Sequence, residues 1–289
     1  MAAFSKVGNV AYWVSCMEEQ SVIELEHVDA GYPGVKILQD VSFSVEKGEI
    51  FVLLGGSGCG KSTIMRHMIG LNAVMGGTLS VLGLEMNRRN RDKILRRIGV
   101  MYQSGALFGS MTCLQNVMLP MEEFTKLRRK ERIVRARELL SQVGLEDAES
   151  KMPAEISGGM KKRVAIARAL ALDPEIIFLD EPSAGLDPIT SSALDDLILQ
   201  IRKERGTTFV VVTHELPSIF KIADRCAMFF DGQIVSSDVP YRFFAENTYY
   251  TTAASRISRN FFDGAVTVDE VVALCRMNNK KSYKGDSAR

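Results

Sequence analysis

Residues 55–63 have the types and spacing of a loop that binds phosphate. They follow the pattern G-x-x-x-x-G-K-[ST] between a short apolar strand, 50–54, and a helical segment that Gly70 closes. Glycines allow successive N–H groups to point inward, and the helix that begins at Lys61 adds its positive N-terminal end. We expect the Lys61 ammonium to reach the β- and γ-phosphates and the Ser62 hydroxyl to ligate Mg²⁺. The expected nucleotide-binding residues of this loop are Gly55, Gly56, Ser57, Gly58, Cys59, Gly60, Lys61, Ser62 and Thr63.

A pair of carboxylates, Asp180 and Glu181, directly follows the apolar strand 176–179. Ligands of open α/β sheets bind at the carboxyl ends of strands, where one carboxylate can hold Mg²⁺ and the next can take a proton from water. Two alternatives are disfavoured by this combination: a glycine-rich turn with a chance lysine, and an acidic pair that caps a helix. The loop alone does not name the nucleotide or the reaction, because kinases, GTPases, motors and transporter ATPases all share it.

A second helix start with uncovered backbone donors lies at Ser157-Gly158-Gly159-Met160. Ser157 is a natural N-cap, and the two glycines leave N–H groups exposed, so this helix end is a second candidate phosphate site. One nucleotide cannot use both helix ends of one molecule if they are far apart. The sequence therefore indicates a head-to-tail dimer.

Strands of two kinds are expected to position these residues. Apolar and polar residues alternate over 23–29 and 41–45, the pattern of half-buried antiparallel strands. The continuous apolar runs 176–179 and 209–212 suit parallel strands covered on both faces. Residues 229–235 indicate a hairpin with an Asp-Gly turn, which we interpret as an antiparallel appendage.

Helices are expected between these strands. Asp187 as N-cap, with Pro188 at the first helical position, opens a helix whose apolar face is Leu194, Leu197, Ile198 and Ile201. Arg and Lys are dense over 88–97 and 126–137, but no aromatic residues are interleaved with them. Solvated helix faces therefore explain both runs better than nucleic-acid binding.

Composition indicates a soluble globular chain with no general attraction to polyanions. Hydrophobic residues make up 46% and charged residues 25% of the sequence, and the net charge is +1. The 5 cysteines are scattered without C-x-x-C spacing, which argues against a disulfide framework or zinc site and suits a reducing cytosol. The apolar runs are too short to cross a membrane as helices.

The chain resembles the ATPase subunits of ABC transporters, whose motifs occur in order over residues 22–240. These motifs are Tyr32 as the aromatic loop, the phosphate loop, Gln103 in Met-Tyr-Gln-Ser, the signature Ile156-Ser157-Gly158-Gly159-Met160, Asp180-Glu181, Ser183-Ala184-Gly185-Leu186-Asp187, and His214. The signature departs from the commoner L-S-G-G-Q at both ends, at positions that do not carry the phosphate-facing N–H groups. The resemblance implies an α/β fold: a P-loop (RecA-like) parallel sheet core with an antiparallel β subdomain and an inserted α-helical signature subdomain.

This resemblance also implies an ATPase that uses ATP and Mg²⁺ and works as a homodimer. Two copies sandwich two ATP molecules, and Ser157, Gly158 and Gly159 of one copy complete the site of the other. Tyr32 is implied to stack on the adenine. The implied metal ligands are Ser62, Gln103 and Asp180, and the implied catalytic residues are Glu181, His214, Lys61 and Gln103.

Within that site the resemblance gives each catalytic side chain a role. Glu181 orients and deprotonates the attacking water, and His214 contacts the γ-phosphate. Gln103 couples the metal to the segment that follows it, which faces a membrane partner. Outside any motif, His27 and His67 are expected to be buried structural histidines.

A closer resemblance is to the ATPases of Mce-associated, Mla-like phospholipid transporters. It rests on residues 103–108, 116–120 and 185–191 and on the pair Asp224-Arg225. It implies phospholipid transport across the cell envelope, with an integral-membrane permease and a Mce-domain lipid carrier as partners and no nucleic acid. The implied location is cytoplasmic, peripheral on the cytoplasmic face of the inner membrane.

Three alternatives stay open beside the lipid hypothesis. A permease for amino acids or metal ions would use the same ATPase residues, and this alternative ranks second. A soluble ABC-type ATPase of DNA repair or translation usually has two cassettes or long coiled coils, and no heptad run occurs here. A nucleotide-binding regulator without turnover does not need the intact Glu181 and His214.

The chain is expected to divide into three parts. Residues 1–21 form an N-terminal extension, for which Met17 offers an alternative start, and 22–246 form the ATP-binding domain, with its helical subdomain at about 104–160. Residues 247–289 form a C-terminal tail with a short helix around 266–275.

Overall fold

The computed structural model describes residues 20–246, 270–273 and 276. The predicted N-terminal extension, except for its last residues, and most of the predicted tail lie outside these residues. Residues 270–273 and 276 are helical. The three-part division of the chain stays a prediction.

The described elements alternate between strands and helices along most of the chain. The strands are β1 (Ser21–Tyr32), β2 (Val35–Glu46), β3 (Ile50–Gly55), β4 (Gly76–Val81), β5 (Leu84–Glu85), β6 (Ile98–Met101), β7 (Ile176–Asp180), β8 (Thr208–Val212), β9 (Arg225–Phe230) and β10 (Gln233–Asp238). The helices are α1 (Lys61–Met68), α2 (Arg91–Leu95), α3 (Cys113–Phe124), α4 (Arg129–Gln142), α5 (Gly158–Ala169), α6 (Pro188–Arg205), α7 (Leu216–Ile222) and α8 (Pro240–Glu246), with the 3₁₀ turns η1 (Glu146–Ala148) and η2 (Pro153–Glu155).

The strands form two sheets of different character. The larger sheet has six strands in the order β10-β9-β3-β8-β7-β6; the five strands from β9 to β6 are parallel, and β10 pairs antiparallel with β9. The smaller sheet, β2-β1-β4-β5, is antiparallel throughout. The predicted α/β class, with a parallel core sheet and an antiparallel β subdomain, is therefore confirmed.

The hairpin predicted over residues 229–235 is present as β9 and β10. Asp231 and Gly232 take positive φ angles of 47° and 76° in its turn. Its interpretation as an antiparallel appendage is wrong for β9, which pairs in parallel with β3 inside the core sheet. Cys226 and Ala227 are fully buried there, as a central parallel strand requires.

Both faces of the six-stranded sheet are buried, and successive side chains of each strand point to opposite faces. In β3, Ile50, Val52 and Leu54 join an apolar cluster with α3 to α8. Phe51 and Leu53 join the other cluster, formed with α1, α2 and the four-stranded sheet. This two-sided burial explains why the core strands are continuous apolar runs in the sequence.

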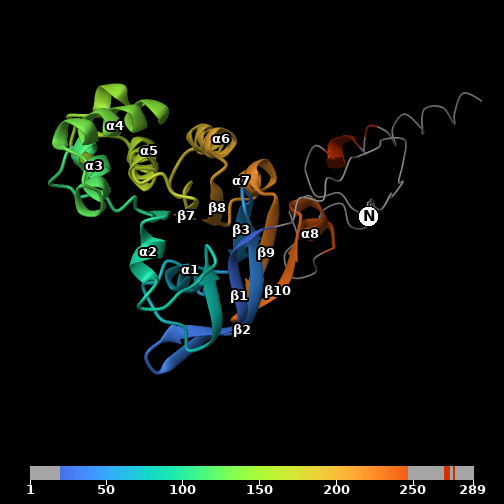
Figure 1. Cartoon of the computed structure of the whole chain (residues 1–289). Coiled ribbons are helices and arrows are strands. Elements are labelled where there is room, and N and C mark those ends of the chain that lie inside the picture. Colours follow the sequence, from blue (N-terminus) through green and yellow to red (C-terminus); the bar gives the residue numbers. More distant parts are fainter. Residues whose placement is uncertain (1–19, 247–269, 274–275, 277–289) are drawn as a thin grey trace, which may run out of the picture.

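Helices α3, α4 and α5 pack together at one side of the molecule, away from the β1–β2 hairpin (Figure 1). A capping box begins α3, since the N–H of Gln115 donates to Oγ1 of Thr112 and the N–H of Thr112 donates to Oε1 of Gln115. One turn later, the fully buried Asn116 binds both backbone groups of Phe108. The segment that follows β6 is thereby fixed onto α3.

Candidate active site

The phosphate loop connects β3 to α1 through backbone conformations that favour glycine. Gly55, Gly58 and Gly60 have φ angles of 145°, 80° and 106°. A Cβ on Gly55 would lie 2.4 Å from the carbonyl oxygen of Phe229, and a Cβ on Gly60 would lie 2.4 Å from a methyl carbon of Leu38. The loop therefore passes too close to its neighbours for any side chain at these two positions.

Lys61, the first residue of α1, folds its side chain back over this loop. Its Nζ donates to the carbonyl oxygens of Gly55 and Gly56, at 2.8 Å each, and lies 3.6 Å from the Sγ of Cys59. The ammonium and the N-terminal end of α1 thus lie on the same loop. Together they form a positively charged cradle suited to an anion.

Oxygen atoms suited to a hard divalent cation lie beside Lys61. The hydroxyl of Ser62 donates to Oδ1 of Asp180 at 3.3 Å, which joins α1 to the end of β7. Burial raises the pKa of Asp180 above its usual value. A hydroxyl and a carboxylate are ligands that Mg²⁺ accepts, and the neighbouring anion cradle would bring phosphate oxygens to it, so the predicted pair Ser62 and Asp180 fits this metal. Among the described residues, no group of three or more His, Cys, Asp or Glu side chains could hold a metal ion by itself.

Glu181 and His214 form a pair at the ends of neighbouring strands. Oε1 of Glu181 lies 3.0 Å from Nδ1 of His214, which follows β8. The other carboxylate oxygen, Oε2, is buried and has no hydrogen-bond partner in the described part of the chain. Buried polar atoms are seldom left unpaired, so this oxygen is available to a small ligand such as water.

The backbone of Glu181 is held in an uncommon conformation. Its φ angle is 46°, in the left-handed region that non-glycine residues seldom adopt. Its N–H donates to the carbonyl oxygen of Val212 at 2.8 Å, and its carbonyl accepts from the N–H of Ala184 at 3.2 Å. These bonds to β8 and to the following turn keep the carboxylate at the edge of the sheet. Conformational strain of this kind is concentrated at functional sites.

Tyr32 and Gln103 lie at two other edges of the site. Tyr32 ends β1 instead of standing in a separate loop, and its hydroxyl accepts from Arg66 of α1 at 2.8 Å. Gln103 follows β6, and its carbonyl oxygen accepts from Nζ of Lys162. The side chain of Gln103 is exposed, and no hydrogen bond joins it to Ser62 or Asp180 among the contacts of the described residues.

Ser157, Gly158 and Gly159 lie apart from the phosphate loop. The hydroxyl of Ser157 caps α5 by accepting from the N–H of Met160 at 3.3 Å. Helix α5 packs in the apolar cluster on one face of the core sheet, whereas α1 packs in the cluster on the other face. Within this chain, therefore, the two candidate phosphate-binding helix ends are not brought together.

The two histidines outside the motifs differ from each other. His67 is fully buried, with Nδ1 at 2.8 Å from the carbonyl oxygen of Thr63, as predicted. The prediction that His27 is buried is wrong, because its side chain is 83% exposed and lies beside Asp40. The Asp40 carboxylate raises the pKa of His27.

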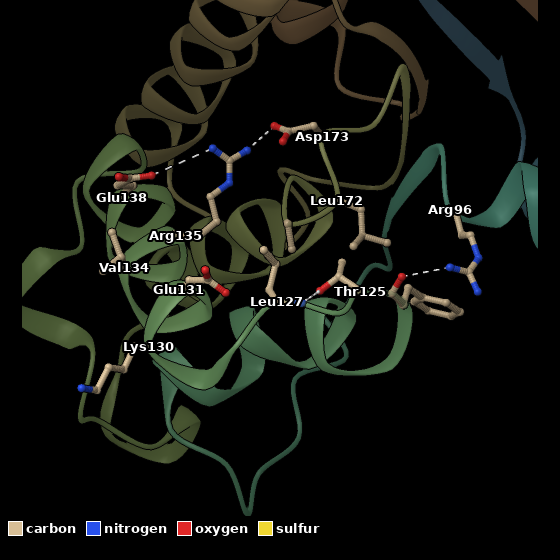
Figure 2. A pocket seen from close by; sticks show the side chains of 12 residues that line it. Arg96, Thr125, Leu127, Lys130, Glu131, Val134, Arg135, Glu138, Leu172 and Asp173 are labelled. Atoms are coloured by element: carbon tan, nitrogen blue, oxygen red, sulfur yellow. Dashed lines mark hydrogen bonds and ion pairs between the residues drawn. The ribbon is translucent and has the colours of Figure 1, made fainter.

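A cavity of about 640 Å³ lies away from the nucleotide-binding residues. It is bounded by α4, the end of α3 and the turn after α5, and Figure 2 shows Arg135 between Glu138 and Asp173 at its rim. Asp173 also accepts from Arg205 of α6 at 2.7 Å. Apolar side chains such as Val134 line this cavity, so it does not resemble a phosphate site.

Some residues at the site were not predicted from the sequence. Lys162 of α5 and Arg66 of α1 both contact predicted site residues, but each lies in a helix where basic residues are common. Their only sequence signal is closeness to a motif. No described helix is both long and apolar enough to span a membrane.

Comparison with known proteins identifies the family to which this arrangement belongs. Residues 38–184 match the profile described as ABC transporter. The chain belongs to the ABC transporter family.

Two relatives of this ABC transporter chain are named for small solutes. It is 39% identical over 225 residues to the methionine import ATP-binding protein MetN of Bacillus subtilis, covering 77% of this chain and 64% of MetN. It is 36% identical over 245 residues to the probable ribonucleotide transport ATP-binding protein mkl of Mycobacterium tuberculosis, covering 84% of this chain and 66% of mkl. The chain thus spans about two thirds of the length of these relatives. Neither name supports the predicted closer kinship with Mla-like phospholipid transporters.

Solved structures of ABC cassettes share the fold. MJ0796, seen as a dimer in a post-hydrolysis state bound to ADP and Pi, matches with a TM-score of 0.69 and 30% identity, covering 75% of this chain and 98% of MJ0796. CbiO1 of Clostridium perfringens, part of the ABC transporter complex cbiONQ, matches with a TM-score of 0.73 and 27% identity, covering 84% of this chain and 96% of cbiO1.

Proposed function

We propose that this chain is the ATP-hydrolysing subunit of an ABC transporter and acts as a head-to-tail dimer beside an integral-membrane permease. One observation carries the proposal. At the carboxyl ends of β3, β7 and β8, five side chains form a continuous series: Lys61, Ser62, Asp180, Glu181 and His214. Chain neighbours and hydrogen bonds connect each member of the series to the next. This series supplies a phosphate contact, metal ligands and a base within one site.

The phosphate loop binds ATP through backbone N–H groups and the Lys61 ammonium. Lys61 already lies over the loop through Gly55 and Gly56, so its charge is positioned for the β- and γ-phosphates. Tyr32, 38% exposed beside α1, offers its ring to the adenine. Ser62, Asp180 and Gln103 are the proposed ligands of Mg²⁺, which when bound neutralises charge that develops on the phosphate oxygens.

Hydrolysis requires a water molecule in line with the γ-phosphate. Oε2 of Glu181 is buried and unpaired among the described residues. It accepts a proton from that water while the water oxygen forms a bond to the γ-phosphorus. The bond from the γ-phosphorus to the ADP oxygen breaks, which gives ADP and inorganic phosphate. His214 holds the other carboxylate oxygen and contacts the γ-phosphate with the rest of its ring.

The dimer brings together two helix ends that one chain keeps apart. Ser157, Gly158 and Gly159 at the start of α5 face the γ-phosphate bound to the partner copy. The dimeric state of MJ0796, at 30% identity, supports this arrangement. ATP binding then closes the dimer, and hydrolysis reopens it.

The transported substrate is the finer part of the proposal. The names of the relatives favour the alternative drawn from the sequence, a small solute, over phospholipid. The phospholipid hypothesis, with its Mce-domain carrier, is supported by residues 103–108, 116–120 and 185–191. For either substrate we propose a peripheral position on the cytoplasmic face of the inner membrane, bound to the permease.

The experiment that tests the reaction is E181Q, which removes the base and keeps the shape of the side chain. We expect ATP affinity within about twofold of wild type and turnover lowered by at least about a hundredfold, since a general base contributes 10²–10⁴. E175Q is the control, because Glu175 lies just before the opposite end of β7 and pairs with Arg97 at the surface. Equal ATPase rates in E181Q and wild type would exclude Glu181 as the base.

The partner and substrate require a separate experiment on the same variant. Tagged E181Q is purified from membranes solubilised with ATP and Mg²⁺, and the associated proteins are identified by mass spectrometry. A permease with a solute-binding protein supports small-solute transport, and a permease with a Mce-domain protein supports lipid transport. Recovery of no membrane protein at all contradicts the transporter assignment.

A further inference from the structure

Lys162 is a buried lysine of α5, the helix that begins with the signature motif. It contacts two other motif segments, those of Gln103 and Glu181. It lies in the first half of α5, and only 5% of its surface is exposed. Its Nζ donates to the carbonyl oxygen of Gln103 and, at 3.1 Å, to the carbonyl oxygen of Glu181. One ammonium thus bonds the segment after β6 and the segment after β7.

Burial of this ammonium has an electrostatic cost that its surroundings offset. Burial lowers the pKa of Lys162, and the carboxylates of Asp180 and Glu181 act against that shift. An apolar side chain such as methionine, one heavy atom shorter, would avoid the cost of burying a charge. The function of Lys162 therefore depends on its hydrogen-bond donors, which bind the carbonyl oxygens of Gln103 and Glu181.

Arg168, six residues further along α5, makes a comparison with Lys162 possible. Arg168 donates to the carbonyl oxygens of Gly105 and Ala106, at 2.8 and 2.7 Å, and so holds the segment after β6. Lys162 holds that segment at Gln103 and also holds Glu181. Arg168 by itself would be enough to anchor the segment after β6, so the contact that distinguishes Lys162 is the one with Glu181.

The second contact acts on a backbone that needs support. Glu181 has a φ angle of 46°, and its carbonyl oxygen accepts from Lys162 and from the N–H of Ala184. Loss of one of these bonds allows the peptide after Glu181 to turn, which moves the carboxylate. Misplacement of a reacting group by about 1 Å can cost about a hundredfold in rate.

We propose that Lys162 is a positioning residue. Its two hydrogen bonds connect the segment of Gln103 to the backbone of Glu181, and they fix the position of Gln103, the proposed metal ligand, relative to Glu181, the proposed base. This inference rests on the proposed ATPase function. It predicts that the loss of Lys162 affects catalysis and metal use at the same time and leaves the binding of nucleotide unchanged.

The test compares K162M with wild type in the full chain. We expect the kcat of K162M for ATP to fall by about tenfold to about a hundredfold, the range for small misplacement of catalytic groups. The Mg²⁺ concentration at half-maximal rate should rise at least about threefold, because Gln103 is less well held, while the Kd for a fluorescent ATP analogue measured without Mg²⁺ stays within about twofold. K203M is the control, since Lys203 is an exposed lysine on α6.

Two further variants separate positioning from general stability. K162R keeps the charge and the hydrogen-bond donors in a larger side chain and should recover part of the kcat that K162M loses. K162Q, whose amide is one bond shorter and reaches at most one carbonyl, should fall between K162R and K162M, and it replaces K162M if that variant does not fold.

The outcomes distinguish this inference from the proposed function. Wild-type kcat and Mg²⁺ dependence in folded K162M or K162Q overturn the inference. A parallel loss of kcat, ATP affinity and Tm in every folded variant also overturns it, because that pattern marks a structural role. If wild type itself does not hydrolyse ATP, the proposed function fails instead.

Discussion

At the scale of single residues, the site is organised by pairs of groups that hold each other. Ser62 binds Asp180, Glu181 binds His214, and Tyr32 binds Arg66. Each pair joins residues from different elements, so the side chains are fixed by the fold before any ligand binds. Such preorganisation is the main requirement of phosphoryl transfer.

The Lys61 ammonium gives the first prediction at this scale. K61A removes the full charge from the anion cradle and should weaken ATP binding by at least about tenfold, because hydrogen bonds to charged groups contribute about 1.5–3 kcal/mol. Titration with a fluorescent ATP analogue measures this effect. K93A, at an exposed lysine of α2, is the control and should bind ATP as wild type does. Unchanged affinity in K61A would contradict the assignment.

The sequence predicts the motif residues better than the residues that hold them in position. The spacing around Lys61 and the strand before Asp180 locate these residues at the correct strand ends, because local pattern and chain order decide both. Lys162 could not be predicted, since its partners are backbone carbonyls that any sequence supplies. His27 was misjudged because neither its neighbour Asp40 nor its positive φ angle of 50° leaves a pattern in the chain.

At the scale of elements, helix α6 shows both the reach and the limit of periodicity. Its predicted apolar face, with Leu194 and Ile198, is buried as expected, and Asp187 caps it through the N–H groups of Ile189 and Thr190. Asp195 is also buried, and its carboxylate oxygens lie 3.0 and 2.8 Å from the hydroxyl of Ser218 in α7. A buried polar contact between two helices has no period, so sequence pattern does not reveal it.

Asp195 gives a prediction about stability and pH. Burial raises its pKa, so the stability it contributes is present below its unfolded pKa, near 3.8, and is lost as pH rises through the folded value. D195N keeps an acceptor for Ser218 and cannot ionise. The difference in Tm between D195N and wild type should therefore be more positive at pH 7 than at pH 4, by a few degrees in a chain of this size. Thermal melts at the two pH values measure the difference, and a difference that is equal or reversed would contradict it.

The order of strands in the core sheet also exceeds what the sequence predicts. Continuous apolar runs identify β7 and β8 as buried parallel strands. Strand β9 is also an apolar run, but its length and composition equally suit a strand that pairs only within a hairpin. Its partner β3 is distant in the chain, and only tertiary packing selects it. The sequence therefore predicts the hairpin of β9 and β10 but not the parallel pairing of β9 with β3.

At the scale of the whole molecule, the site is divided between two faces of one sheet. Helix α5 and helix α1 pack in different apolar clusters, one on each face of the core sheet. In the head-to-tail dimer that we propose, the second copy supplies the other helix end. Nucleotide-dependent association is therefore the property that reports on the complete site.

Gly158 allows this association to be tested without disturbing the fold. A Cβ at Gly158 would come no closer than 3.8 Å, to a methyl carbon of Leu186, so a side chain is accommodated. In the E181Q chain, ATP should convert monomer to dimer. Adding G158D should abolish the dimer, because a carboxylate would face the phosphates of the partner copy.

G158N, of the same shape but neutral, is the matched control for this prediction and should retain most of the dimer. Light scattering after size-exclusion chromatography measures the mass, and the Tm of both variants should stay within about 3 °C of E181Q, as surface substitutions usually do. Dimer formation by G158D equal to that by G158N would contradict the head-to-tail arrangement.

Asp173 has a mechanical consequence for the chain as a whole. Its carboxylate binds Arg135 of α4 and Arg205 of α6, and its side chain is 62% exposed. Exposed ion pairs contribute little free energy and exchange readily with water and salt. Helices α4 and α6 each pack against α5, and the Asp173 carboxylate adds a polar connection between the two. Raising the ionic strength should therefore weaken this connection between α4 and α6 while the apolar core stays intact.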